Sequence, residues 1–135
     1  MKTAVIVNPK AGNGRTAKIW LNVESSLKQC IGSFKLINTT YRGEAEHLTR
    51  QELQNGAVNI VAVGGDGTLN EVIIGLLHKG YTETIFGYYP MGTANDFSKT
   101  AGLVNSINDF IKALEKINIK KINVGQVLCK NDIFE

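Results

Sequence analysis

One unit repeats along the chain and limits what it can fold into: a short apolar run, a turn rich in glycine, and a stretch with helical periodicity. Residues 4–8 and 59–63 are apolar runs of this kind, and residues 85–89 form a third that stops at Pro90. Such runs are typical of strands that are buried on both faces of a parallel sheet. The repetition predicts an α/β fold with an open, mostly parallel sheet and helices on both faces.

The remaining elements follow from the spacing of the apolar residues. Helices are expected at residues 16 to about 32, 43–53, 69–78 and 107–117, with one more opening at 92–97. Residues 34–40 read as a strand, and the imperfect alternation at 121–128 predicts an edge strand. Open sheets of this class bind ligands beyond the carboxyl ends of their strands. The glycine turns start at those ends.

Size and composition favour one ordinary globular domain. The chain has 135 residues, of which 43% are hydrophobic and 20% charged, so it can bury a single core. No apolar run approaches the roughly 18 to 20 residues that span a bilayer, and Met1-Lys2 leads straight into a strand. These features predict a cytoplasmic protein without a signal peptide. Cys30 and Cys129 lie far apart and are interpreted as reduced packing residues.

The net charge of +3 is mild, but positive charge gathers near the C-terminal end at Lys112, Lys116, Lys120 and Lys121. We interpret this cluster as the solvated face of a helix. The alternative is a surface that attracts phosphate or an anionic membrane.

The first glycine turn runs from Asn8 to Arg15. Its small residues let backbone amides approach an anion, and Lys10 and Arg15 supply positive charge. It is not a Walker A loop, and it lacks the third glycine of the dinucleotide fingerprint. Phosphate or adenosine contact and a simple strand-to-helix turn both remain open.

The second turn, Gly64-Gly65-Asp66-Gly67-Thr68, places a carboxylate where a helix begins. Asp66 there would repel a phosphate unless it reaches the nucleotide through Mg²⁺ or ordered water. Asp66 is therefore the leading catalytic or metal-linked candidate. The backbone of Gly65 and Gly67 is expected to approach the phosphates.

Capping is the structural explanation of the same stretch. Thr68 and Glu71 have the spacing of a capping box, and direct contact of either with a ligand stays open. The third turn, residues 92–97, repeats this spacing with Thr93 and Asp96. It offers a further hydroxyl and a carboxylate that complements the helix dipole.

Residues 8–12, 64–72 and 90–97 together resemble the diacylglycerol kinase catalytic family in order and spacing. That family includes bacterial diacylglycerol kinases and sphingosine kinases. The resemblance implies a Rossmann-like nucleotide-binding domain of the phosphofructokinase and NAD-kinase type. Residues 1–135 would be the N-terminal ATP-binding domain of a lipid kinase. A β-rich C-terminal domain, absent from this chain, would complete the lipid site and supply the general base and further Mg²⁺ ligands.

The resemblance also implies which residues contact the nucleotide. Thr39 enters because the family has a threonine four residues before a Gly-acid-Ala turn, here Gly43-Glu44-Ala45. Ala11 departs from the family, which commonly has serine there. The implied contacts are Asn8, Pro9, Lys10, Ala11, Gly12, Thr39, Gly65, Asp66, Gly67, Thr68, Leu69, Asn70, Glu71 and Thr93.

The implied reaction is transfer of the γ-phosphoryl group of ATP to the hydroxyl of diacylglycerol or a related lipid, with Mg²⁺ as cofactor. The expected partners are ATP and a lipid acceptor. Peripheral contact with the membrane is also expected, and nucleic acid is not. The edge at residues 121–128 would permit a homodimer or pairing with the second domain. The isolated chain is expected to be inactive. Two alternatives stay open: a kinase of the NAD-kinase type, and a nucleotide-binding module without catalysis.

Overall fold

The fold alternates strands and helices as the periodicity predicts. The computed structural model describes residues 2–78, 83–92, 95, 96, 99, 106–115 and 124–125. The elements are β1 (Thr3–Val7), α1 (Arg15–Ile31), β2 (Lys35–Asn38), α2 (Glu44–Gln54), β3 (Asn59–Gly64), α3 (Asp66–Leu77), β4 (Ile85–Pro90) and α5 (Ile107–Glu115). Most predicted boundaries lie within two residues of the observed ones.

The strands form a four-stranded parallel sheet in the order β2-β1-β3-β4. The chain moves from β1 to β2 on one side, then returns to β3 on the other side of β1. The strand order therefore reverses between β1 and β3. A reversal of this kind opens a crevice at the carboxyl ends of the two strands, where doubly wound sheets bind their ligands.

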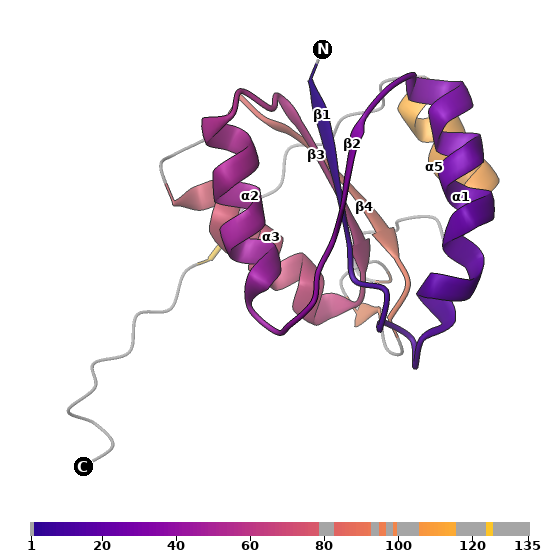
Figure 1. Cartoon of the computed structure of the whole chain (residues 1–135), viewed down its shortest axis with the longest axis horizontal. Helices are drawn as coiled ribbons and strands as arrows, with labels where there is room; N and C mark the ends of the chain where they lie inside the picture. The colour runs from indigo at the N-terminus through magenta and orange to yellow at the C-terminus, as the bar shows by residue number, and fades with distance from the viewer. Residues whose placement is uncertain are drawn as a thin grey trace.

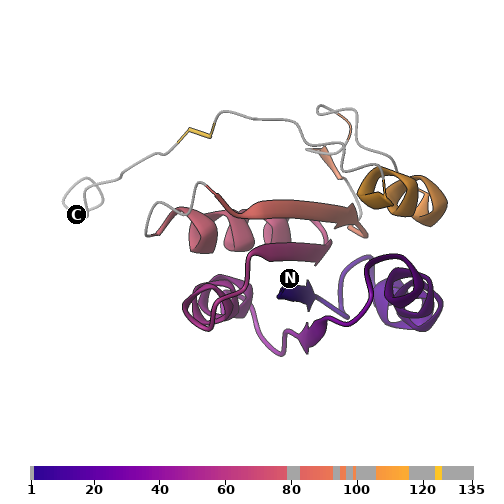
Figure 2. The same ribbon diagram turned by 90° about the horizontal axis from the view of Figure 1, so that it is seen from above.

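Helices cover both faces of the sheet, as predicted. Figures 1 and 2 show α2 and α3 on one face and α1 with α5 on the other. Side chains alternate across a strand, so Ala4 and Ile6 of β1 join the core under α2 and α3. Val5 and Val7 join the second core, which includes Trp20 of α1.

The start of α3 differs from the prediction. The helix begins at Asp66 rather than Leu69, its N-cap is Gly65, and no side chain caps it. The predicted capping box at Thr68 and Glu71 is therefore wrong. The helix has already begun before Thr68, so Thr68 is not at the N-cap position. Thr68 accepts from Asn8, and Glu71 accepts from the amides at the start of α2.

Several predictions fall outside the described residues: most of the helix at 92–97, the end of the helix at 107–117, the strand at 121–128, and Cys129. Cys30 is a half-buried residue of α1. Its Sγ lies 3.7 Å from the carbonyl oxygen of Ile111, so it packs against α5. Within the described part of the chain, no helix is both long and apolar enough to cross a bilayer.

Candidate functional site

The site lies at the carboxyl edge of the sheet, where the segments after all four strands meet. In the parallel register Val7 lies beside Asn38 and Val63, and Gly64 lies beside Pro90. Residues 8–14, 39–43, 65–68 and 91–92 therefore start at one edge. This confirms the expectation that the glycine turns share one end of the sheet.

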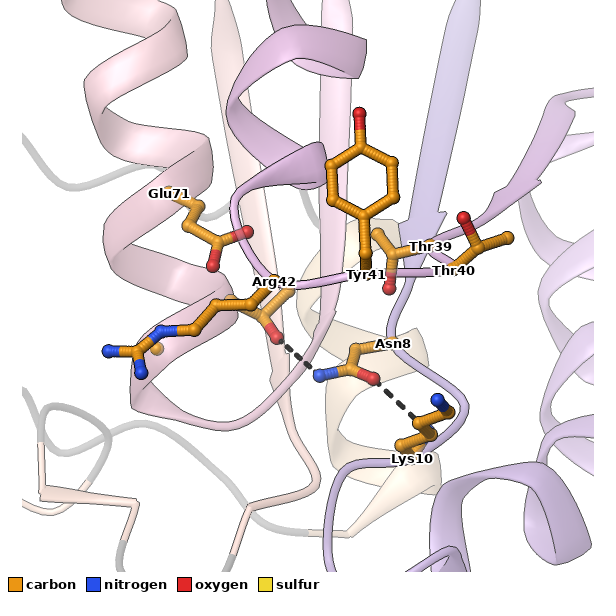
Figure 3. Close-up of a pocket in the computed structure, with 9 residues that line it drawn as sticks. Asn8, Lys10, Thr39, Thr40, Tyr41, Arg42 and Glu71 are labelled. Carbon is orange, nitrogen blue, oxygen red and sulfur yellow. Dashed lines mark hydrogen bonds between the residues drawn. The ribbon is translucent and has the colours of Figure 1, made fainter.

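A hollow of about 360 Å³ opens at this edge (Figure 3). Six of the fourteen predicted contacts line it: Asn8, Lys10, Thr39, Gly67, Thr68 and Glu71. The sequence reasoning missed the other lining residues, Thr40, Tyr41 and Arg42. Their position directly after Thr39, at the end of β2, was the signal that could have found them.

Asn8 ties the first loop to the start of α3. Its backbone amide donates to the carbonyl oxygen of Val63 (2.9 Å), which extends the pairing of β1 with β3. Its side-chain Nδ2 donates to Thr68 Oγ1 (3.2 Å), and its Oδ1 accepts from the amide of Lys10 (3.1 Å). Asn8 thus fixes the two loops on either side of the β1–β3 crevice.

The segment from Thr39 to Gly43 forms the opposite wall of the hollow. Thr39 is buried, and its amide donates to the carbonyl oxygen of Val7 (2.8 Å). The amide and hydroxyl of Thr40 both donate to the carboxylate of Glu44. The backbone hydrogen bond from Thr40 lowers the pKa of Glu44, which is half-buried at the start of α2.

Glu71 joins this wall to α3. Its Oε1 accepts from the amide of Gly43 (2.9 Å) and its Oε2 from the amide of Ala45 (3.3 Å). The carboxylate therefore caps the N-terminus of α2 instead of its own helix. This contact replaces the capping box that the spacing predicts.

The side chains that face solvent around the hollow are cationic and aromatic. Lys10 and Arg42 are exposed, and neither makes an ion pair among the described residues. The ring of Tyr41 is 62% exposed and points away from Asn8 and Lys10 (Figure 3). The hollow thus presents two cations to an anionic ligand.

Asp66, the leading catalytic candidate, does not line the hollow. It is the first residue of α3, and its Oδ2 accepts from the amide of Asp96 (3.0 Å). It also lies near Tyr88, whose hydroxyl donates to the carbonyl oxygen of Gly64 (3.1 Å). Burial, and secondarily the charge of Asp66, raise the pKa of Tyr88. Asp66 links the turns after β3 and β4.

The motif glycines serve different purposes. A methyl group at Gly12 would lie 2.6 Å from the Met91 carbonyl oxygen, and one at Gly65 would lie 3.1 Å from Cα of Gly92. These glycines let the loops pack against each other. A methyl group at Gly67 would meet nothing within 4 Å. Gly67 also lines the hollow, so its missing side chain leaves space there.

The other predicted contacts lie around the hollow without lining it. Ala11 is buried, and its carbonyl oxygen accepts from Thr16 Oγ1 (3.1 Å). The side chain of Leu69 belongs to the core under α2 and α3, while Asn70 is exposed and Pro9 half-buried. Thr93 lies outside the described residues. Ligand contacts by these residues stay predictions.

Among the described residues, no three His, Cys, Asp or Glu side chains gather as a ligand cage for a metal. Mg²⁺ in kinases is usually held by one or two carboxylates together with substrate phosphates and water. A single carboxylate at the head of α3, that of Asp66, fits this mode of binding.

Comparisons with known proteins agree with this architecture. The model of the family described as "Diacylglycerol kinase catalytic domain" matches residues 2–127. A diacylglycerol kinase of Bacillus subtilis (strain 168) is 33% identical over 131 residues, covering 94% of this chain and 42% of that protein. A "Probable lipid kinase YegS-like" of Citrobacter koseri is 34% identical over 90 residues, covering 66% of this chain and 30% of that protein.

A solved structure has the same fold. The crystal structure of a diacylglycerol kinase from Bacillus anthracis str. Sterne superposes with a TM-score of 0.72 at 30% identity, covering 86% of this chain and 42% of that one. The chain belongs to the diacylglycerol kinase catalytic domain family, a family of lipid kinases. It spans about two fifths of the length of the diacylglycerol kinases it matches.

Proposed function

We propose that this chain binds ATP in the hollow at the β1–β3 crevice, and that the protein transfers the γ-phosphoryl group to the hydroxyl of diacylglycerol or a related lipid. One observation carries the proposal. The hollow joins two exposed cations, Lys10 and Arg42, to the N-terminal end of α3, which has no side-chain cap. Cationic side chains and the backbone amides at a helix N-terminus, which have no acceptor within the helix, are complementary to phosphates.

Different lining residues would contact the phosphates and neutralise their charge. The first-turn amides of α3, at Gly67 and Thr68, would donate to phosphate oxygens, because an α-helix leaves its first amides without partners. The absence of a side chain at Gly67 would let a phosphate approach that backbone closely. Lys10 and Arg42 would neutralise the remaining charge.

Asp66 would contribute through Mg²⁺. Bound with ATP, Mg²⁺ supplies charge neutralisation of the phosphates during transfer. The carboxylate of Asp66 lies at the head of α3, next to the Asp96 amide that it accepts from. We propose that Asp66 orients the metal and phosphates and that Thr93 adds a hydroxyl contact.

The proposal that the acceptor is a lipid rests on the family and on the names of the similar proteins. In this proposal a second, β-rich domain binds the lipid and supplies the general base, and the protein works in the cytoplasm at the periphery of the membrane. Catalysis then comes from positioning and electrostatic stabilisation, with no covalent intermediate on this chain.

Activity assays with competing acceptors test the proposal. The complete protein is incubated with labelled ATP, Mg²⁺ and either diacylglycerol in mixed vesicles or NAD. Label in the lipid fraction supports the lipid kinase. Label on NAD would instead favour the NAD-kinase alternative. ATP binding without transfer to either acceptor would favour a nucleotide-binding module.

A further inference from the structure

We infer that Glu71 is a positioning residue: it holds the Thr39–Gly43 wall in place for ATP instead of contacting ATP itself. The inference rests on the proposed ATP site and assigns one of its lining residues a task. Both carboxylate oxygens are already engaged, one by the amide of Gly43 and the other by the amide of Ala45.

Glu44 of α2 anchors the wall at Thr40, but the N-cap of α2 offers no side chain to the amides at its start. The N-cap of α2 is Gly43, which has a left-handed backbone (φ 90°) and no side-chain cap. The amide of Glu44 donates to the carbonyl oxygen of Tyr41 (3.3 Å), whereas the amides of Gly43 and Ala45 donate to Glu71. Glu71 accepts both hydrogen bonds from its position on α3, which lies on the same face of the sheet as α2.

The same helix carries the other side of the hollow. Thr68 and Gly67 lie three and four residues before Glu71 in α3, so one helical face bears all three. The clamp at Glu71 therefore sets the separation between the α3 wall and the wall that carries Thr39 and Arg42. Figure 3 shows Glu71 between α3 and the segment of Tyr41 and Arg42.

Electrostatics argue against direct contact between Glu71 and ATP. Both carboxylate oxygens of Glu71 already accept an amide, and repulsion between this carboxylate and a nearby phosphate would weaken ATP binding. The negative charge of Glu71 is instead placed at the N-terminal end of α2, where the helix dipole stabilises it.

Glu71→Ala and Glu71→Gln test this assignment in the whole chain. Titration calorimetry measures the Kd for ATP with Mg²⁺, and amide hydrogen exchange follows Gly43 and Ala45. Glu71→Ala should weaken ATP binding about tenfold, the loss expected when hydrogen bonds to a charged group are removed. Glu71→Gln should lie between, because its amide oxygen still accepts one bond. Glu24→Gln on α1, on the opposite face of the sheet, is the matched control and should change neither reading.

A double-mutant cycle separates positioning from general destabilisation. If Glu71 acts through the wall, Arg42→Ala should weaken ATP binding clearly in the wild-type background and much less in the Glu71→Ala background. Exchange at the amides of Gly43 and Ala45 should accelerate in Glu71→Ala.

Three results would overturn the assignment. Unchanged ATP affinity in Glu71→Ala would exclude a role in the site. Weaker binding with unchanged exchange at Gly43 would indicate direct contact with ATP. Additive effects of Glu71→Ala and Arg42→Ala would exclude action through the wall. Absence of ATP binding by the wild-type chain is a separate outcome, because it removes the proposed function and this inference together.

Discussion

At the scale of single residues, the role of a glycine depends on what occupies the space that a side chain would fill, more than on its position in a motif. Gly12 and Gly65 leave room for the protein's own backbone, namely Met91 and Gly92. Gly67 leaves room for solvent in the hollow. The sequence motif presents all of them alike, so only the packing of the loops singles out Gly67 for ligand approach.

Gly67→Ala should therefore weaken ATP binding without weakening the fold. A methyl group at this position meets no protein atom, and alanine favours a helix more than glycine. Overpacking against bound phosphate should cost about 1–3 kcal/mol, or roughly 5- to 150-fold in Kd. Calorimetry and thermal melting of the same samples measure both effects, with Ser25→Ala on α1 as the control. Unchanged affinity would mean that ATP does not approach Gly67.

Asp66→Asn should abolish kinase activity while the fold persists. Asparagine keeps the size and can still accept from the Asp96 amide, but it removes the charge that would face Mg²⁺. The loss of kcat should be at least about 100-fold, as for other groups that stabilise charge in a transition state. Steady-state kinetics with diacylglycerol, together with thermal melting, checks this. A fully active Asp66→Asn enzyme would contradict the assigned role.

At the scale of elements, the apolar periodicity predicted where helices and strands run, whereas their capping contacts escaped prediction. Thr68 and Glu71 have the local spacing of a capping box, yet Thr68 bonds to Asn8 and Glu71 to the start of α2. The spacing of residues along the chain predicts only partners within the same element. Contacts between elements depend on the order of strands in the sheet, which brings distant segments together.

The start of α2 should respond to pH through Glu44. The hydrogen bond from the Thr40 amide lowers the pKa of Glu44 in the folded protein. Its stabilising contribution is then complete above the ordinary glutamate pKa and lost as the pH falls through the lowered folded value. Denaturant unfolding from pH 7 downward should show Glu44→Gln less stable than wild type at neutral pH, with the two converging in acid. A difference that is constant across this range would contradict the assignment.

An ion pair between the buried Glu52 of α2 and the exposed Lys35 of β2 should stabilise the opposite end of the sheet. Glu52 is 1% exposed, and its Oε1 lies 2.5 Å from Nζ of Lys35. Glu52 Oε2 has no hydrogen-bond partner among the described residues. Lys35→Met should lower the free energy of unfolding by about 1–3 kcal/mol, because a buried carboxylate loses its charged partner.

Adding Glu52→Gln to Lys35→Met should recover part of that loss, since the buried group is then neutral. Urea unfolding of the single and double variants measures the coupling. Equal stability of Lys35→Met and wild type would show that the ion pair contributes nothing.

At the scale of the whole molecule, the site comes from the reversal of strand order between β1 and β3. Periodicity predicted a parallel sheet, and the glycine turns predicted the edge at which the hollow lies. The order β2-β1-β3-β4 is what places Thr39, Thr40 and Arg42 across from Gly67. Neither apolar patterns nor short motifs report strand order, so that wall was predicted only at Thr39, through the family resemblance.

The central claim is that the hollow at this edge binds ATP. Titration calorimetry of the chain with ATP, with and without Mg²⁺ and with NAD as competitor, tests it most directly. We predict that ATP binds, that Mg²⁺ strengthens the binding, and that NAD does not displace it. Failure of ATP to bind under any of these conditions, or displacement of ATP by NAD, would contradict the proposal.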